Sequence, residues 1–233
     1  MVLVKSGGNA WGEVGGYAPL VEFTGAKYSP QLILHATANC SYRLEQHNTG
    51  EVLTKFETVD ARVGLSYDMR FRNDLRGTVI WTHYSGHISD NVSDPVLIGP
   101  DSGFEVVTAR VIRDYGKTFR VGASFRPTIH AHPTMQWFGA EEFVEYFPHE
   151  TSADSHHLKP FISAGLEQYG NESVELTAHL QAGYTTADHF SEKPERSMRF
   201  VVGAYSGQDT RLKYFQYFHQ QSHFIYGGLV VDL

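Results

Sequence analysis

The chain has 233 residues, a net charge of −7 and 13% aromatic residues. The negative charge argues against nucleic acid as a partner, because phosphate binding requires a basic surface. Mean hydropathy is −0.31, and no run of roughly 20 apolar residues occurs, which excludes membrane-spanning helices. A transmembrane barrel fits this composition, because only every second residue of each strand faces lipid.

Period-2 alternation predicts strands along most of the chain. Four segments separate apolar from polar residues cleanly onto two faces: 31–45, 61–72, 118–130 and 174–184. Weaker strand candidates of similar length are 76–88, 103–114, 134–147, 158–170, 196–208 and 220–233. Such runs exceed the roughly 5–6 residues usual in soluble proteins and match the roughly 9–11 of a tilted membrane-crossing strand. They predict an all-β fold, a single transmembrane antiparallel β-barrel of about ten strands, within a range of about 8–12.

The chain is expected to form one barrel over residues 31–233, preceded by a Gly-rich segment, 1–30, that adds either an extra strand pair or an entry segment into the lumen. Longer connections are predicted at 46–58 and 88–102. They share one end of the barrel if strands alternate in direction, and long loops lie outside the cell in bacterial outer-membrane barrels. We therefore predict a bacterial outer-membrane location. Because the first nine residues are too short to contain the apolar core of a signal peptide, we expect that a signal peptide has already been removed.

Charged residues within the strands are expected to point inward, because a lone charge facing hydrocarbon costs roughly 2–4 kcal/mol near the midplane. About ten strands leave a narrow lumen that side chains can nearly fill. The leading interpretation is therefore a structural or accessory subunit, or a narrow conduit with a largely plugged lumen, without an enzymatic reaction. The predicted lumen network comprises Arg43, Arg62, Asp68, Arg70, Arg72, His87, Asp90, Arg110, Arg120, Arg126, Glu167, Glu175, His179 and Arg199.

Residues 81–91 carry the side chains with possible chemistry. His83, Ser85 and His87 are spaced by two, so they share one face of a strand. A histidine beside a serine is the minimum of a nucleophile–base pair, and two histidines with Asp90 could hold a metal such as zinc. The third interpretation is a polar network in the lumen. His87 and Asp90 suit a wet interior better than lipid, so we expect this face to point inward, with no metal and no cofactor.

The stretch 83–90 (HYSGHISD) resembles the His-x-Ser-x-His-x-x-Asp segment of a family of uncharacterised bacterial outer-membrane proteins, a domain of unknown function. Short segments downstream are also similar, at 120–123, 161–167, 205–208 and 226–229. The resemblance covers most of residues 30–233. It implies a barrel in a membrane and no known activity.

A second resemblance is to the outer-membrane phospholipase A and lipid A deacylase barrels, which carry His-x-Ser on one strand and Asn or Glu on the next. His83 and Ser85 match this spacing, and Glu105 is the acidic candidate on the following strand. The resemblance implies, as the alternative, hydrolysis of a lipid ester on the outer wall, with membrane lipids or lipopolysaccharide as partners. Other subunits of an outer-membrane assembly are the partners under the leading interpretation. The side of the barrel on which Ser85 lies decides between the two.

Overall fold

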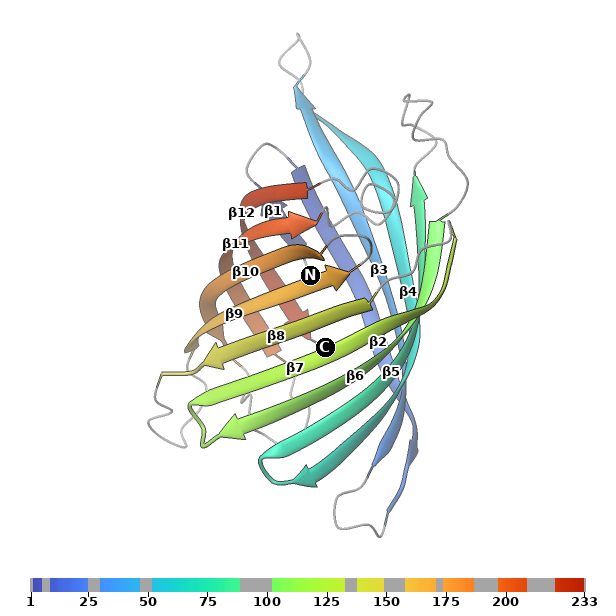
Figure 1. The fold of residues 1–233 in the computed structure, drawn as a ribbon. Helices are drawn as coiled ribbons and strands as arrows, with labels where there is room; N and C mark the ends of the chain where they lie inside the picture. The colour runs from blue at the N-terminus through green and yellow to red at the C-terminus, as the bar shows by residue number, and fades with distance from the viewer. Residues whose placement is uncertain are drawn as a thin grey trace.

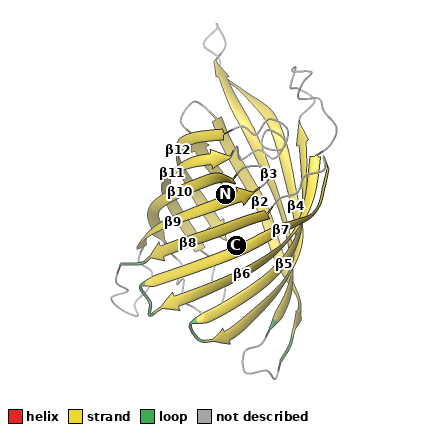
Figure 2. Cartoon of the chain, viewed as in Figure 1, coloured by secondary structure: helices red, strands yellow, loops and turns green. Residues whose placement is uncertain are grey.

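The computed structural model describes residues 2–5, 9–24, 30–46, 52–88, 102–132, 138–148, 158–170, 174–186, 197–208 and 221–232. In this part of the chain, strands and turns are the only regular elements (Figure 2). No helix in it is long and apolar enough to cross a membrane. The strands are β1 (Val2–Lys5), β2 (Asn9–Glu22), β3 (Gln31–Gln46), β4 (Val52–Arg72), β5 (Leu75–Ile88), β6 (Ser102–Tyr115), β7 (Phe119–His132), β8 (Phe138–Tyr146), β9 (Lys159–Gly170), β10 (Val174–Thr185), β11 (Ser197–Gln208) and β12 (Gln221–Asp232).

Each strand pairs antiparallel with its neighbours in sequence, and the strand order closes into a barrel (Figure 1). The closure runs through the short strand β1, which pairs with β12 from Val2 to Lys5 and with β2 from Val2 to Val4. An all-antiparallel order lets short hairpin connections join most strands. Closure also pairs the strand edges that an open sheet would leave exposed.

The inner face of the barrel can be recognised from contacts between strands that are not neighbours. The Arg126 guanidinium on β7 donates to the Tyr169 hydroxyl on β9 at 2.7 Å. Arg110 on β6 donates to Glu141 on β8 at 3.0 Å. Only the concave side of a sheet brings alternate strands this close. The opposite residues of the same strands, Phe125 among them, therefore form the outer wall.

The outer wall is apolar, as period-2 alternation predicts. On β10, Leu176 and Leu180 are more than half exposed, whereas Thr177 between them in sequence is buried against the lumen. The apolar faces of all four clean alternating segments point outward, which confirms that part of the sequence prediction. An apolar band around the outside of a closed barrel, with polar residues inside, is the arrangement of barrels that lie in lipid.

The two ends of the barrel differ. One end, which we call the turn end, carries the tight turns at 73–74 and 116–118. The other, which we call the loop end, lies where β5 stops at Ile88 and β6 begins at Ser102. Exposed aromatic side chains gather on the outer wall toward the turn end, as in the aromatic girdles of membrane barrels. They are Phe71, Tyr115, Phe119, Tyr146, Tyr184 and Phe200.

Two sequence expectations are corrected by this architecture. Residues 2–5 and 9–22 are wall strands, which is the extra strand pair considered for residues 1–30, so the barrel does not begin at residue 31. The long connection expected at 46–58 is shorter, because β4 already begins at Val52. Glycines and charged residues interrupt the apolar alternation in these strands, so a prediction based on that alternation did not assign them. The strand ends from which both predicted connections leave, the last residues of β3 and β5, lie at the loop end.

A charge at the middle of the outer wall is expected to destabilise the barrel far more than one near its end. Val202 lies midway along β11 and is 64% exposed. Val202→Arg should lower the free energy of unfolding by about 2–4 kcal/mol, and Ser206→Arg, near the loop end, by about 0–1 kcal/mol. Urea titration of the chain folded into phospholipid vesicles measures both. Equal losses at the two positions would contradict a lipid-facing wall.

Candidate active site on the outer wall

The face of β5 that carries Ser85 points away from the lumen. On the opposite face, the Tyr84 ring stacks on Phe104 at 4.5 Å and 17°, and the Arg62 guanidinium lies 5.5 Å from the Tyr84 ring centroid. On the face of Ser85, Trp81 is exposed and pairs with Leu65 of the apolar β4 face. The expectation that His83, Ser85 and His87 point into the lumen is therefore wrong. They lie on the outer wall, near the loop end.

Glu105 lies directly beside His83 on this wall. The two residues are register partners on β5 and β6, and His83 Nδ1 lies 3.4 Å from Glu105 Oε1. Their side chains are 46% and 34% exposed, so both reach the surface of the wall. The residue proposed from sequence as a third catalytic member thus occupies the position behind the histidine. A carboxylate there fixes the orientation of the imidazole ring.

Ser85 makes its hydrogen bond to the second histidine. Its hydroxyl Oγ lies 2.9 Å from His87 Nε2, two residues further along the same face. The serine is therefore flanked by imidazoles on both sides, since i and i+2 positions of a strand lie roughly 7 Å apart. A serine hydroxyl hydrogen-bonded to an imidazole nitrogen is the arrangement that activates a nucleophile.

Small residues surround Ser85 on the neighbouring strands. Its register partners are Ala61 on β4 and Gly103 on β6. A Cβ atom on Gly103 would lie 2.8 Å from the Tyr84 carbonyl oxygen, so glycine permits the close approach of β5 and β6 at this point. The buried Ser102 hydroxyl also donates to the Gly86 carbonyl at 3.4 Å. The register partners of Ser85 therefore carry no side chain larger than a methyl group.

Two further histidines continue the polar row onto β7. His130 pairs with Glu105 and His132 with Gly103, and both are exposed. His130 is the last residue of the segment predicted as a strand over 118–130, and His132 lies just beyond it; in the structure both belong to the end of β7, which carries a bulge beside Glu105. Among the described residues, no group of three or more His, Cys, Asp or Glu side chains is arranged to hold a metal ion. Asp90, the ligand considered with His83 and His87, lies outside the described residues.

A second serine–histidine pair lies on the outer wall at the same end of the barrel. Ser206 Oγ on β11 is 2.9 Å from His223 Nδ1 on β12, and both side chains are exposed. The register partner of Ser206 on β10 is Ala178. The Ser85–His87 pair, in contrast, has the carboxylate of Glu105 on its neighbouring strand. Among the described residues, no acidic residue is a register partner of the Ser206–His223 pair. An acidic partner distinguishes the cluster of His83, Ser85, His87 and Glu105, which we call the Ser85 cluster.

The lumen holds most of the charged network predicted from sequence. Arg120 contacts Asp114 at 2.7 Å and Glu145 at 3.4 Å, and Arg126 lies 3.8 Å from Glu167, whose carboxylate also accepts from the Tyr169 hydroxyl. The inner face also carries Arg62, Asp68, Arg70, Arg110, Glu175, His179 and Arg199, with Arg43 paired to Glu57 near the loop end. His87 is the clear exception, because it faces outward.

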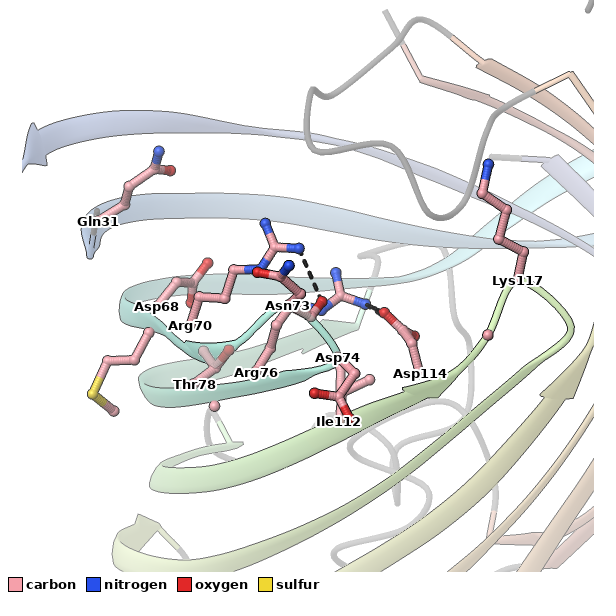
Figure 3. A pocket seen from close by; sticks show the side chains of 13 residues that line it. Gln31, Asp68, Arg70, Asn73, Asp74, Arg76, Thr78, Ile112, Asp114 and Lys117 are labelled. Carbon is pink, nitrogen blue, oxygen red and sulfur yellow. Dashed lines mark hydrogen bonds and ion pairs between the residues drawn. The ribbon is translucent and has the colours of Figure 1, made fainter. Parts of the chain in front are cut away.

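Arg72 is the second exception. A register shift between Arg70 and Arg72 turns it toward the hairpin, where its guanidinium binds Asp74 at 2.8 Å and remains largely exposed. This hydrogen bond lowers the pKa of Asp74 below its usual range. Nearby, a cavity of about 680 Å³ opens at the turn end between residues of both charge signs (Figure 3). The contacts Arg76–Asp114 and Arg70–Asn73 lie among the residues that line this cavity. The lining therefore has no continuous surface of a single charge sign.

The closed antiparallel sheet, the apolar outer wall and the polar interior define a β-barrel of the outer-membrane type. No protein-family model matches the chain, and no curated protein sequence matches it. Among solved structures, it is similar to outer membrane phospholipase A from Escherichia coli, with a TM-score of 0.58 and 13% identity over 96% of this chain and 78% of that one. The KdgM porin has a TM-score of 0.49 and 10% identity over 100% and 99% of the two chains. At 13% identity, the likeness to outer membrane phospholipase A shows the fold alone.

Breaking the lumen network should destabilise the barrel without touching the outer wall. Arg126→Met removes hydrogen bonds donated by a charged group and is expected to cost about 1.5–3 kcal/mol of unfolding free energy. The double variant Arg126→Met with Glu167→Gln should recover part of that loss, because no carboxylate is then left unpaired. Urea titration in vesicles tests this. A double variant as unstable as the sum of its single variants would argue against coupling.

Proposed function

We propose that this chain is a lipid ester hydrolase of the bacterial outer membrane, with Ser85 as nucleophile. The observation that carries the proposal is the outward position of the Ser85 cluster on a lipid-facing wall. A membrane lipid lies beside such a wall, so its ester group reaches Ser85 by lateral diffusion. In a water-filled lumen the same residues would meet only soluble molecules.

The chemistry of the Ser85 cluster supports acyl transfer. The Ser85 hydroxyl is hydrogen-bonded to an imidazole, and the neighbouring imidazole of His83 faces the Glu105 carboxylate at 3.4 Å. Such a set takes a proton from the serine, forms an acyl-serine and returns the proton to the leaving alcohol. The register partners of Ser85, Ala61 and Gly103, add no bulky side chain beside the hydroxyl.

The position of the cluster along the barrel also fits a lipid ester. If the loop end faces the outside, as in barrels with tight turns on the periplasmic side, Ser85 lies toward the outer leaflet. Ester groups of lipids occupy the boundary between headgroups and acyl chains, close to the end of the apolar wall. The chains would then extend along Val63 and Trp81 toward the turn end.

The interpretation from sequence, a structural subunit or narrow conduit, remains a prediction for the lumen. The ion pairs between Arg110 and Glu141 and between Arg120 and Asp114 favour a plugged interior over a pore. Such a plug is compatible with a hydrolase whose chemistry lies entirely on the outside. Planar-bilayer conductance tests the conduit, and open-channel currents would support it independently of any hydrolysis.

Ser85→Ala should abolish hydrolysis while leaving the barrel folded, because Ala61 and Gly103 show that the wall tolerates small residues there. We expect fatty-acid release from mixed phospholipid and lipopolysaccharide vesicles to fall at least about 1,000-fold. Glu105→Gln, which keeps the shape and removes the charge, should cause a smaller loss.

The matched control is Ser206→Ala, which removes the other outward serine bonded to a histidine. It should hydrolyse as the unmodified chain does. Heat-modifiable migration on a gel verifies that each variant is folded. If Ser85→Ala keeps the activity of the parent protein, or if the parent releases no fatty acid from any of these lipids, the proposed function is wrong.

A further inference from the structure

The contacts of the Ser85 cluster separate it into two pairs. Ser85 Oγ is bonded to His87 Nε2 at 2.9 Å, whereas Glu105 Oε1 lies 3.4 Å from His83 Nδ1 on the other side of the serine. A single relay would need the carboxylate and the serine on the two nitrogens of one ring. Here the carboxylate contacts one imidazole and the serine contacts the other.

Resting on the proposed function, we infer that the two histidines serve different half-reactions: His87 is the base for acylation of Ser85, and His83, held by Glu105, is the base for hydrolysis of the acyl-serine. The two pairs then have distinct tasks, and both histidines are catalytic residues. Each needs only one tautomer, since a ring that accepts at one nitrogen carries its proton on the other.

In the first half-reaction, the Ser85 O–H bond breaks as Oγ bonds to the ester carbonyl carbon, and the proton passes to His87 Nε2. The tetrahedral intermediate then expels the alcohol. The C–O bond of the ester breaks, and the leaving oxygen takes the proton back from His87. The products are the free alcohol portion of the lipid and an acyl group on Ser85, with His87 neutral again.

In the second half-reaction, water attacks the acyl carbon. With Nδ1–H directed at Glu105, His83 has an unprotonated Nε2 that takes a proton from the water. Collapse of the intermediate breaks the bond to Ser85 Oγ, which receives that proton, and the fatty acid leaves. Once Ser85 is acylated, its oxygen has no proton to donate to His87, whereas the His83–Glu105 pair is unchanged.

Water can reach His83 along the wall. His130 is the register partner of Glu105 on β7, and His132, the final residue of that strand, is the partner of Gly103. Together they form a polar track from the loop end through Glu105 to His83. Exposed polar residues on an otherwise apolar outer wall are costly in lipid. Supply of water to the deacylating pair accounts for their position.

Burst kinetics with a p-nitrophenyl acyl ester separate the two half-reactions. His83→Gln should release about one nitrophenol per chain rapidly and then slow at least about 100-fold in turnover, and intact mass spectrometry should detect the acyl-serine. His87→Gln should show no burst and no adduct, with acylation slowed at least about 100-fold. Added imidazole should restore acylation to His87→Ala.

The control is His223→Gln, which disrupts the other outward serine–histidine pair and should leave both phases unchanged. If His83→Gln blocks acylation while His87→Gln retains burst and turnover, His83 is the sole base; the inference fails and the proposed function stands. If neither histidine variant alters either phase, the inference also fails. Absence of any adduct on Ser85 in the unmodified chain overturns both. Asn variants at the two positions replace any Gln variant that lacks heat-modifiable migration.

Discussion

The structure depends on one constraint: in a closed sheet, each residue of a strand faces either the lumen or the outside, and its neighbours face the other way. Charged residues such as Arg126 and Arg110 are held inside by partners on alternate strands. Their apolar neighbours, Phe125 and Val111, are thereby turned outward. The inner network determines which residues of β6 and β7 face the lumen. Because register partners on neighbouring strands face the same side, the pairing of β5 with β6 places Ser85 on the outer wall.

The sequence predicted this alternation well where the two faces differ strongly in polarity, as on β4 and β10. It could not assign the faces of β5, because Val79, Trp81 and His83 on one face are about as apolar as Ile80, Thr82 and Tyr84 on the other. The turn at 73–74 suggests pairing of Arg72 with Leu75. Continued without interruption, that register would pair Val63 with Tyr84 and turn His83 inward. The shift between Arg70 and Arg72 pairs Val63 with His83 instead. A one-residue irregularity reverses every side chain beyond it.

The relation of Glu105 to His83 was also beyond sequence reasoning. A tight hairpin fixes register through its turn, but β5 and β6 are joined by residues 89–101, which set no such limit. The sequence singled out His83, Ser85 and Glu105 by residue type and could not place them in one row. His130 and His132 were missed for another reason. The bulge on β7 interrupts the alternation just before them, so the predicted segment 118–130 stopped at His130 and did not place either histidine on the outer face beside Glu105.

The distribution of charge over the barrel explains why such a site can exist on a lipid-facing wall at all. A charged residue costs several kilocalories per mole at the midplane and little near the interfaces, and the Ser85 cluster lies at the loop end of β5 and β6. Glu105 faces an imidazole on either side, from His83 and His130, so its carboxylate has polar neighbours in every direction along its row.

The opposing charges inside the barrel contribute rigidity, because ion pairs between alternate strands hold the curvature of β6 to β9. A wall held in this way keeps the register of β5 and β6 constant, and it is this register that sets the distances between Ser85, its two histidines and the carboxylate.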